Sequence, residues 1–509
     1  MASPSERGAA PAARSIAGRR RDLLAGGLSL VFDRVLLLLA LTVAASWLIL
    51  AIAHINDRAF IAWDDGARMG LAQYARRGIL YPPLFENGVY GGTRFMPIPI
   101  MIHAGLSWIT GEFLASGKLM TYLSFAAVVG VTFLAMRQVG CSPMRAAALI
   151  GAVSTTWVAV LASLGISHDP LPIALQLSAL MIAARSVSRR TIVISAVLCA
   201  AALFAKLSAL WAVAAIGLWL WRKSRRWVVP FLGAFLAATT VGYGVTQVAS
   251  GGRFADNLAA LSTAGIGGGA GLAHLLDQVV SLLSLAPVAF GLLPLGAYEA
   301  AIAARRRSIT VFHLAFLCSV AILLPVLTDQ GASINHFLDP LVLAAILTAS
   351  LWQRQELRPT RSLAIAVILV FGLLGSFSAG LGRRAWDAAL GASDRRLDPR
   401  PLDGLVRSDD LVLAEDASIV IALGHVPVVL DPFMLPRIGD LHPEWLRPLV
   451  DRLERREFDR VVVNYRLDSA SEHRYTKIHF GASVTDAIRR NYVLLAIRAG
   501  FAVYAPRQS

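Results

Sequence analysis

Residues 35–53 read VLLLLALTVAASWLILAIA, an apolar run without a single charged side chain. A helix needs about 20 apolar residues to cross a bilayer, and this run has that length. Ten further uncharged runs follow: 119–136, 146–167, 170–184, 191–205, 207–221, 227–250, 278–298, 308–328, 340–353 and 362–382. The sequence therefore predicts a polytopic α-helical membrane protein with about eleven spans.

The composition agrees with this fold class. Of 509 residues, 56% are hydrophobic and 16% are charged, which excludes a disordered chain and a coiled coil. Three cysteines exclude a disulfide-stapled scaffold. The net charge is +15, but residues 383–509 hold 19 basic and 18 acidic side chains, so the excess lies in the apolar part of the chain. No nucleic-acid partner is indicated.

Basic residues gather in every second connection between the runs, and Lys and Arg are retained on the cytoplasmic side of membranes. The clusters are Arg19–Arg21 in the N-terminal tail, then Arg137 with Arg145, 185–190, 222–226, 305–307 and 354–361. We therefore expect a cytoplasmic basic tail over 1–34, a membrane domain over 35–382 and an extracytoplasmic domain over 383–509. The bias toward Arg over Lys suggests a bacterial cytoplasmic (inner) membrane.

A long first extracytoplasmic loop is expected over residues 54–118. Apolar residues repeat at helical spacing after Asp64 and Asp65, which predicts a helix there. A second apolar stretch, MPIPIMIHAGLSWIT (96–110), is short for a span and begins with prolines. We expect it to lie at the membrane surface, because a span here would place every later basic cluster outside.

The C-terminal region has a different pattern. DLVLAED (410–416), VPVVLD (426–431) and RVVVNYR (460–466) are typical of short strands, and residues 443–458 are typical of a helix. These segments predict a small α/β domain over about residues 400–509. The sequence contains no phosphate loop, paired-cysteine metal motif or serine-hydrolase elbow.

Ionisable and polar residues collect at the predicted outer ends of the spans, where they are costly unless they are paired, hydrated or functional. They are Asp64, Asp65, His168, Asp169, Lys206, Asn335, His336 and Asp339. Each has a structural alternative. The acids could cap helices, Lys206 could extend to the headgroups, and His336 could be a structural hydrogen-bonding residue. Their shared side of the membrane favours a joint functional site.

The order of these features resembles the integral-membrane C-type (GT-C) glycosyltransferases. WDDGARMGLAQYARRGILYPP (63–83) resembles the first-loop signature of that family, an acidic pair followed by a helix, a glycine and a Tyr-Pro segment. GGTRFMPIPI (91–100), SHDP (167–170), LFAKLSALW (203–211) and INHFLDP (334–340) follow in the family's order. The similarity is strongest to bacterial relatives of protein mannosyltransferases and lipid A aminoarabinose transferase. Asp65 stands where many relatives have Glu, and His336 where an aromatic residue is commoner.

This resemblance implies transfer of a sugar from a polyprenyl-phosphate carrier to a lipid, glycan or protein acceptor at the outer membrane face, with inversion. It implies Asp64 as the general base, with Asp65 and Asp169 as further catalytic acids. Donor-phosphate contacts are then expected from Lys206, Arg68, Arg76 and Arg94, and other site contacts from His168, Asn335 and His336.

Three points stay open in the sequence. No cofactor is implied with certainty, and metal use varies among relatives, so a divalent ion at Asp65, Asp169 and His168 is one alternative. A polytopic transporter or lipid-linked sugar flippase is the main alternative function, although such proteins favour polar groups near the midplane and inverted repeats. A non-catalytic scaffold and a transferase of another membrane fold are the others.

Overall fold

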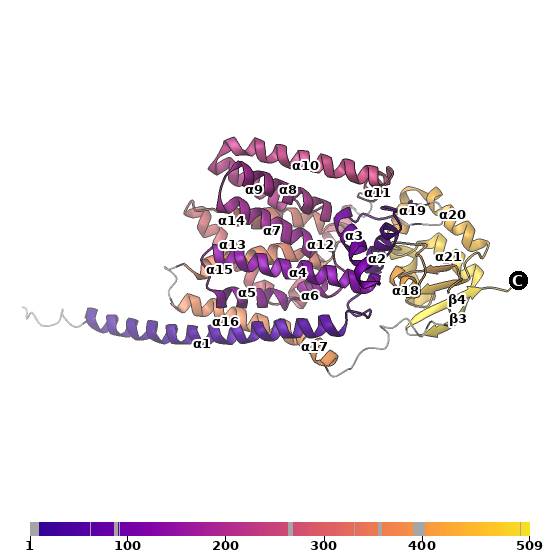
Figure 1. The fold of residues 1–509 in the computed structure, drawn as a ribbon. Helices are drawn as coiled ribbons and strands as arrows, with labels where there is room; N and C mark the ends of the chain where they lie inside the picture. Colours follow the sequence, from indigo (N-terminus) through magenta and orange to yellow (C-terminus); the bar gives the residue numbers. More distant parts are fainter. Residues whose placement is uncertain are drawn as a thin grey trace, which may run out of the picture.

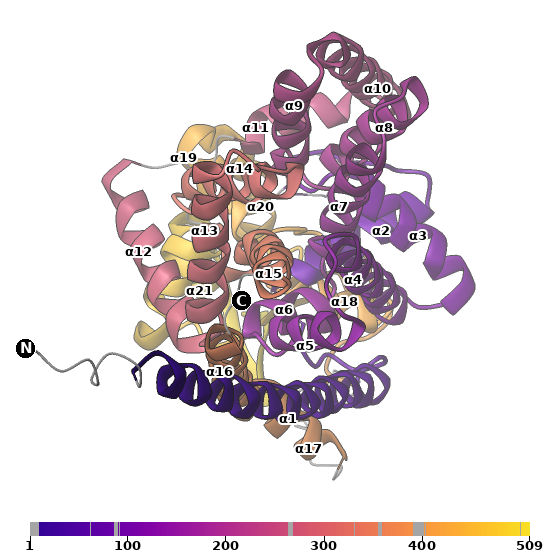
Figure 2. The ribbon, with the colours of Figure 1, turned by 90° about the vertical axis from the view of Figure 1, so that its left-hand side faces the viewer.

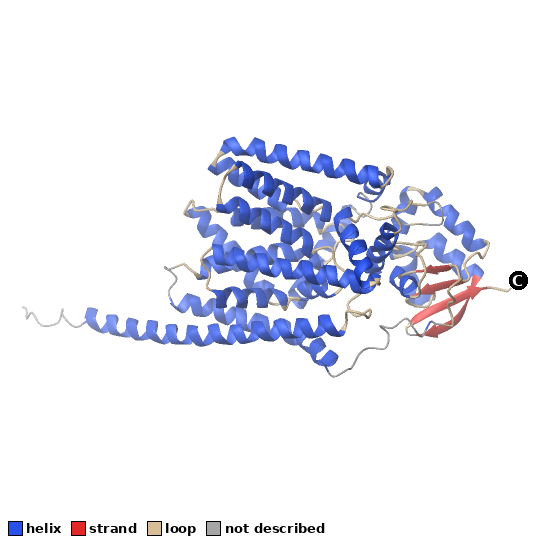
Figure 3. Ribbon diagram, in the orientation of Figure 1, coloured by secondary structure: helices blue, strands red, loops and turns tan. Residues whose placement is uncertain are grey.

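The computed structural model describes residues 10–61, 63–85, 90, 92–262, 268–329, 331–354, 359–389, 402, 404–498 and 500–508. Most of the chain forms a bundle of roughly parallel and antiparallel helices, with a small α/β domain at one end (Figures 1 and 3). The bundle helices are α1 (Ala10–Ala53), α4 (Phe113–Gln138), α5 (Pro143–Ser154), α6 (Trp157–Leu164), α7 (Pro170–Arg185), α8 (Arg189–Ala205), α9 (Trp211–Lys223), α10 (Val228–Ala249), α12 (Gly268–Leu285), α13 (Ala289–Arg305), α14 (Val311–Val326), α15 (Leu338–Trp352) and α16 (Pro359–Ser376).

Each predicted apolar run falls on one of these helices or on a pair of them. By length and composition, four helices of the described chain could each cross a membrane, or six spans result if each bent pair counts as one. Two runs are not single straight helices. Run 146–167 bends by 82° between α5 and α6, and run 278–298 crosses a 110° bend between α12 and α13. Pro287 lies at the second bend, where its missing N–H removes a helical hydrogen bond.

Helix α15 is the central helix of the bundle. It is surrounded by other helices when the molecule is viewed along the bundle (Figure 2), and nearly all of its residues from Leu338 to Trp352 are buried. An apolar helix buried on all sides is typical of the core of a large helical domain. Long α1 lies at the edge of the bundle and packs against α5 and α16, so it exposes an apolar face instead.

Two short helices lie across the end of the bundle that faces the α/β domain (Figure 1). They are α2 (Trp63–Arg76) and α3 (Pro97–Thr110), with α11 (Arg253–Ser262) nearby. The sequence predicts both helices at these positions. Pro97 opens α3, where a proline costs no hydrogen bond, and Gly111 ends it in the left-handed conformation with φ 78°. Helix α17 (Gly382–Ala389) follows the last bundle helix and packs on α1.

The α/β domain contains a four-stranded sheet in the order β1-β2-β4-β3. Its elements are β1 (Val412–Ala414), α18 (Ala417–Ala422), α19 (Met434–Leu441), α20 (Pro443–Glu454), β2 (Arg460–Val463), α21 (Ala482–Asn491), β3 (Tyr492–Arg498) and β4 (Phe501–Pro506). Strands β1 and β2 are parallel, and the other pairs are antiparallel.

Two of the three predicted strands form, as β1 and β2, but the prediction for residues 426–431 is wrong. That segment joins no strand of the sheet. It makes one isolated bridge, between Val429 and Tyr90 of the first loop. Its apolar residues are buried between the core of the α/β domain and the first loop, with Val428 and Val429 in the former and Leu430 in the latter, and a short buried apolar run has the same sequence pattern as a buried strand.

The buried carboxylate of Glu415, directly after β1, joins the end of that strand to Arg474 and Tyr475. It is fully buried and accepts hydrogen bonds from Arg474 at 2.6 Å and from the Tyr475 hydroxyl at 2.8 Å. Burial alone would raise the pKa of Glu415, but His479 and Arg474 lower it from 4.5 to about 2. The stabilisation is therefore complete above pH 4.5 and is lost as the pH falls toward 2.

Glu415→Ala is expected to lower the free energy of unfolding by about 3–5 kcal/mol, because it removes a fully buried carboxylate that accepts hydrogen bonds from Arg474 and the Tyr475 hydroxyl. Glu457, which pairs with Arg455 at the surface, is the control, and Glu457→Ala should leave the free energy of unfolding nearly unchanged. Thermal unfolding from pH 7 to pH 3 measures both. An equal acid-dependent loss in wild type and Glu415→Ala would contradict this role of Glu415.

Candidate active site

The acidic pair of the first loop occupies the first turn of α2, where carboxylates interact favourably with the positive end of the helix dipole. Arg68, one turn further along, binds both acids. Its Nη2 donates to Asp64 at 2.6 Å, and its Nη1 donates to Asp65. Burial alone would lower the pKa of Arg68, but Asp64 and Asp65 raise it, so the guanidinium is charged.

The two acids differ in accessibility. The Asp64 side chain is 28% exposed, and its Oδ1 has no hydrogen-bond partner among the described residues. The Asp65 side chain is 5% exposed and accepts from the backbone N–H of Ile166 at 3.4 Å. Asp64 can therefore receive a proton from a bound molecule, whereas Asp65 holds Arg68 and the loop after α6.

The loop after α6 reaches α2 because its first residue is a glycine. A Cβ on Gly165 would lie 2.6 Å from the carbonyl oxygen of Phe60 and 3.1 Å from Asp65 Oδ2. Arg68 also donates to the carbonyl of Ile166 in this loop, at 2.7 Å. Asp169, four residues after Gly165, is thereby brought to the same end of the bundle as Asp64.

Asp169 is the centre of a second cluster. Lys206, at the end of α8, donates to its Oδ1 at 2.5 Å, and Asn335 Nδ2 donates to its Oδ2. Lys206 also donates to His336 Nδ1 at 3.2 Å. Burial alone would raise the pKa of Asp169, but Lys206 and other neighbours hold it well below its ordinary value. Asp169 is therefore an ionised residue that fixes Lys206 and Asn335.

His168 lies between the two clusters with its ring on Phe95. The ring centroids are 5.5 Å apart, and the Arg68 guanidinium lies 4.8 Å from the same Phe95 ring. Both nitrogens of His168 are buried without a hydrogen-bond partner in the described part of the chain. Burial and the charge of Arg68 lower the pKa of His168, so its ring is neutral. Buried polar atoms without partners are uncommon, and in a site they suggest contact with a ligand.

Arg94 forms a third part of the site. Its Nη1 donates to Asp329 at 2.7 Å, which links the first loop to the loop before α15. Gly331 makes room for this pair, since a Cβ there would lie 2.0 Å from Arg94 Nη2. The side chain of Arg94 is 26% exposed, which leaves part of its guanidinium for a ligand.

Two residues singled out in the sequence have other surroundings. Arg76 ends α2, donates to the carbonyl of Ser107 at 3.2 Å and lies over the Trp108 ring, so it is not brought to the acids. Asp339 accepts from Trp211 Nε1 at 2.6 Å. Both contacts hold neighbouring helices together.

The site does not fit a metal centre. Cations already bind both carboxylates that the sequence suggests as ligands, Arg68 on Asp65 and Lys206 on Asp169. Within the described ranges, no group of three His, Cys, Asp or Glu side chains lies close enough to hold an ion. We therefore derive no chemical step through a metal.

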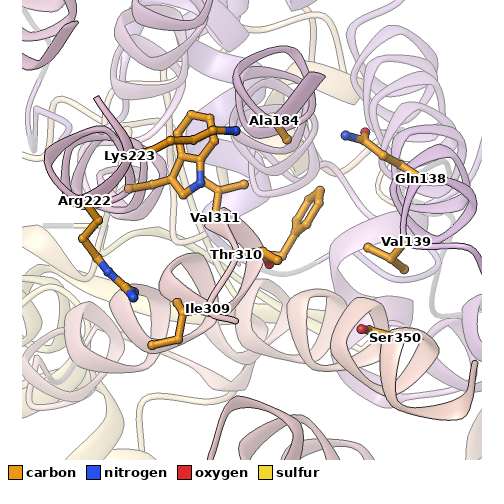
Figure 4. A pocket seen from close by; sticks show the side chains of 11 residues that line it. Gln138, Val139, Ala184, Arg222, Lys223, Ile309, Thr310, Val311 and Ser350 are labelled. Carbon is orange, nitrogen blue, oxygen red and sulfur yellow. The ribbon is translucent and has the colours of Figure 1, made fainter. Parts of the chain in front are cut away.

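A separate pocket of about 650 Å³ opens among the helix ends near Gln138, Arg222, Lys223, Thr310 and Ser350 (Figure 4). These are the ends of the bundle helices opposite the α/β domain (Figure 1). The pocket contains none of the acids discussed above. The candidate active site is the cluster at the other end of the bundle.

Sequence reasoning missed two acids of this region. Asp329 follows α14 in an unremarkable turn, and only its contact with Arg94 identifies it. Asp431 ends the apolar segment 426–431, is 3% exposed and lies in the α/β domain. The sequence does offer a signal for Asp431, because this acid ends an apolar run and is followed by a proline.

Comparison with solved structures shows the same fold in ArnT from Cupriavidus metallidurans bound to undecaprenyl phosphate. The TM-score is 0.59 at 13% identity, over 92% of this chain and 98% of ArnT. The chain has a GT-C fold.

The Archaeoglobus fulgidus oligosaccharyltransferase, solved with a tethered acceptor peptide, is also similar. Its TM-score is 0.53 at 13% identity, over 92% of this chain and 74% of that one. No protein-family model and no curated protein sequence matches the chain. The GT-C fold confirms the architecture expected from the order of the motifs, and the roles of individual residues remain predictions.

Proposed function

We propose that this protein is a glycosyltransferase that moves a sugar from a polyprenyl-phosphate carrier to an acceptor at the outer face of a bacterial cytoplasmic membrane. The observation that carries the proposal is the accessible Asp64 carboxylate at one end of a GT-C fold. Arg68 binds it, and Arg94 and Lys206 lie at the same end of the bundle. The N-terminus is then cytoplasmic and the α/β domain extracytoplasmic.

In the reaction, Asp64 accepts the proton of the acceptor hydroxyl as its oxygen bonds to the anomeric carbon. The bond from that carbon to the phosphate oxygen breaks with inversion, and polyprenyl phosphate leaves as an anion. Such general-base catalysis contributes about 10²–10⁴-fold to a rate. Asp65, which is buried, holds Arg68 in place and takes no proton.

The leaving phosphate needs fixed positive charge, and three cations are available. Lys206 is held by Asp169, Arg68 by both acids of the pair and Arg94 by Asp329. Preorganised cations stabilise developing negative charge without reorganising during the reaction. His168, whose two nitrogens have no hydrogen-bond partner among the residues that the structure describes, is suited to bind a sugar hydroxyl.

The two solved structures support the substrate classes. ArnT binds undecaprenyl phosphate, and the oligosaccharyltransferase holds an acceptor peptide. We propose an undecaprenyl-type carrier as donor and a lipid, glycan or protein as acceptor. The transporter alternative lacks comparable support, because its polar groups belong at the membrane midplane and these acids lie at one end of the bundle.

The test is transfer of radiolabelled sugar by the purified protein from undecaprenyl-phosphate-linked donors to a panel of lipid, glycan and peptide acceptors. Arg68→Gln is expected to lower transfer by about 10²–10³-fold, the usual effect of removing one preorganised donor. Arg76→Gln is the matched control, an arginine of the same helix that binds Ser107, and it should keep transfer within about threefold.

Absence of transfer by wild type across all donors and acceptors would contradict the proposed function. Equal losses in the two arginine variants, at matched folded protein, would instead contradict the assignment of Arg68 to the phosphate.

A further inference from the structure

Residues 426–437 of the α/β domain, which we name the docking segment, lie against the first loop. Tyr90 donates its N–H to the carbonyl of Val428 at 2.9 Å and accepts from the N–H of Leu430 at 3.1 Å. Tyr74 of α2 donates its hydroxyl to the carbonyl of Pro427 at 3.1 Å. The two main-chain hydrogen bonds to Tyr90 and the side-chain hydrogen bond from Tyr74 fix the position of this segment relative to the first loop and α2.

Two glycines on one face of α2 allow the domain to approach closely. Gly66 and Gly70 are four residues apart and therefore share a face of the helix. A Cβ on Gly66 would lie 2.4 Å from Asp416 Oδ1, and one on Gly70 would lie 2.7 Å from Leu430 Cδ2. The helix that presents Asp64 is thus fitted to the α/β domain along its glycine face.

The docking segment contains an acid, Asp431, on which groups of the active site act. Asp431 is 3% exposed, and its Oδ1 accepts the N–H of Phe433 at 3.1 Å at the start of α19. Burial raises the pKa of Asp431 to about 7, the charge of Arg94 opposes this rise, and the charge of Asp64 adds to it. Both residues therefore act electrostatically on Asp431, although it belongs to another domain.

Phe433 and Arg437 complete the contact with the site. A Cβ on Gly331 would lie 3.1 Å from Phe433 Cε1 and 2.0 Å from Arg94 Nη2, so the Phe433 ring and the Arg94 guanidinium are neighbours. Arg437 donates to the carbonyl of Phe433 at 2.7 Å. The α/β domain therefore forms one wall of the space around Arg94.

We infer that the α/β domain supplies a substrate-binding carboxyl group, Asp431, to the active site, beside Asp64 and Arg94. This inference rests on the proposed function. Neutral Asp431 donates a hydrogen bond to an oxygen of the sugar phosphate or of the acceptor, and no proton is transferred. Ionised Asp431 cannot donate and places a second negative charge beside Asp64, which weakens binding of an anionic donor.

The charged groups that act on Asp431 come from three elements. Asp64 lies on α2, Arg94 in the first loop and Arg437 on α19. Arg94 is itself paired with Asp329 of the loop before α15. No ion pair to Asp431 forms within the described part of the chain, so burial and these surrounding groups together determine its charge.

The experiment compares wild type, Asp431→Asn and Asp440→Asn between pH 6 and 8.5. It measures binding of undecaprenyl phosphate and the kcat and KM for transfer. Asn keeps the size and hydrogen-bond donor of the neutral acid, and Asp440 is an exposed acid of α19, the helix that follows Asp431. Affinity for undecaprenyl phosphate should change between pH 6 and pH 8.5 in all three proteins. In wild type and Asp440→Asn, the weakening at pH 8.5 should be about tenfold larger than in Asp431→Asn.

The phosphate of the lipid titrates equally in all three proteins, so the difference between variants reports Asp431. Asp431→Leu should raise KM about tenfold with a smaller change in kcat, as expected for lost ground-state binding. Identical pH profiles in wild type and Asp431→Asn would overturn the inference. If binding of undecaprenyl phosphate depends on pH through Asp431 but no transfer occurs, the result would support the binding role of Asp431 and contradict the proposed reaction.

Discussion

Asp64→Asn is expected to lower sugar transfer by about 10²–10⁴-fold, because asparagine has the shape of the base and cannot accept the proton. The Asp64 side chain is 28% exposed and belongs to the first turn of α2, so the variant should remain folded. Radiolabelled transfer at matched folded protein measures the loss. The KM for the donor should change little, since Asp64 acts on the acceptor.

Asp65→Asn is the informative comparison. That carboxylate is buried against Arg68 and Ile166, so its replacement should reduce the melting temperature as well as transfer. Full transfer by Asp64→Asn would remove it from the mechanism and leave Asp169 as the next candidate base.

Lys206→Met is expected to lower transfer by about 10²–10³-fold, because the leaving phosphate loses a preorganised cation. It also leaves Asp169 buried without its ion-pair partner, which costs about 3–5 kcal/mol of stability. The double variant Lys206→Met with Asp169→Asn should recover much of the stability and none of the transfer. Thermal unfolding and transfer assays on the same preparations separate the two effects.

Lys223→Met is the matched control for this prediction. Lys223 lies at the other end of the bundle, in the pocket near Arg222, and its replacement should leave transfer unchanged. Recovery of transfer in the double variant would show that Lys206 only neutralises Asp169.

The helices could be predicted from the sequence because a bilayer requires long uncharged runs, and each run is local. The bends could not be placed. A run of apolar residues has the same pattern whether it is straight or turns by 110° at a break, as at 278–298. Pro287 alone does not decide this, since Pro294 lies inside α13, which continues to Arg305.

The clustering of Asp64, Asp169 and Lys206 at one end of the bundle could be predicted because each follows or precedes a span. Arg76 shows the limit of that reasoning. It lies eight residues after Arg68, which on a helix is about 12 Å along the axis, so proximity in sequence did not bring it to the acids. Asp431 was missed because its neighbours in space come from another domain, and its own segment was predicted as a strand.

The contacts between α2 and the α/β domain also constrain the order in which the protein folds during synthesis. Gln73 donates to the carbonyl of His425, 352 residues later in the chain. At ribosomal rates of about 5–20 residues per second, the first loop emerges about 20–70 s before its partner segment. During that time the glycine face of α2 has no partner to cover it. A newly made chain should be accessible to proteases near Gly66 until its last hundred or so residues have been synthesised and have folded.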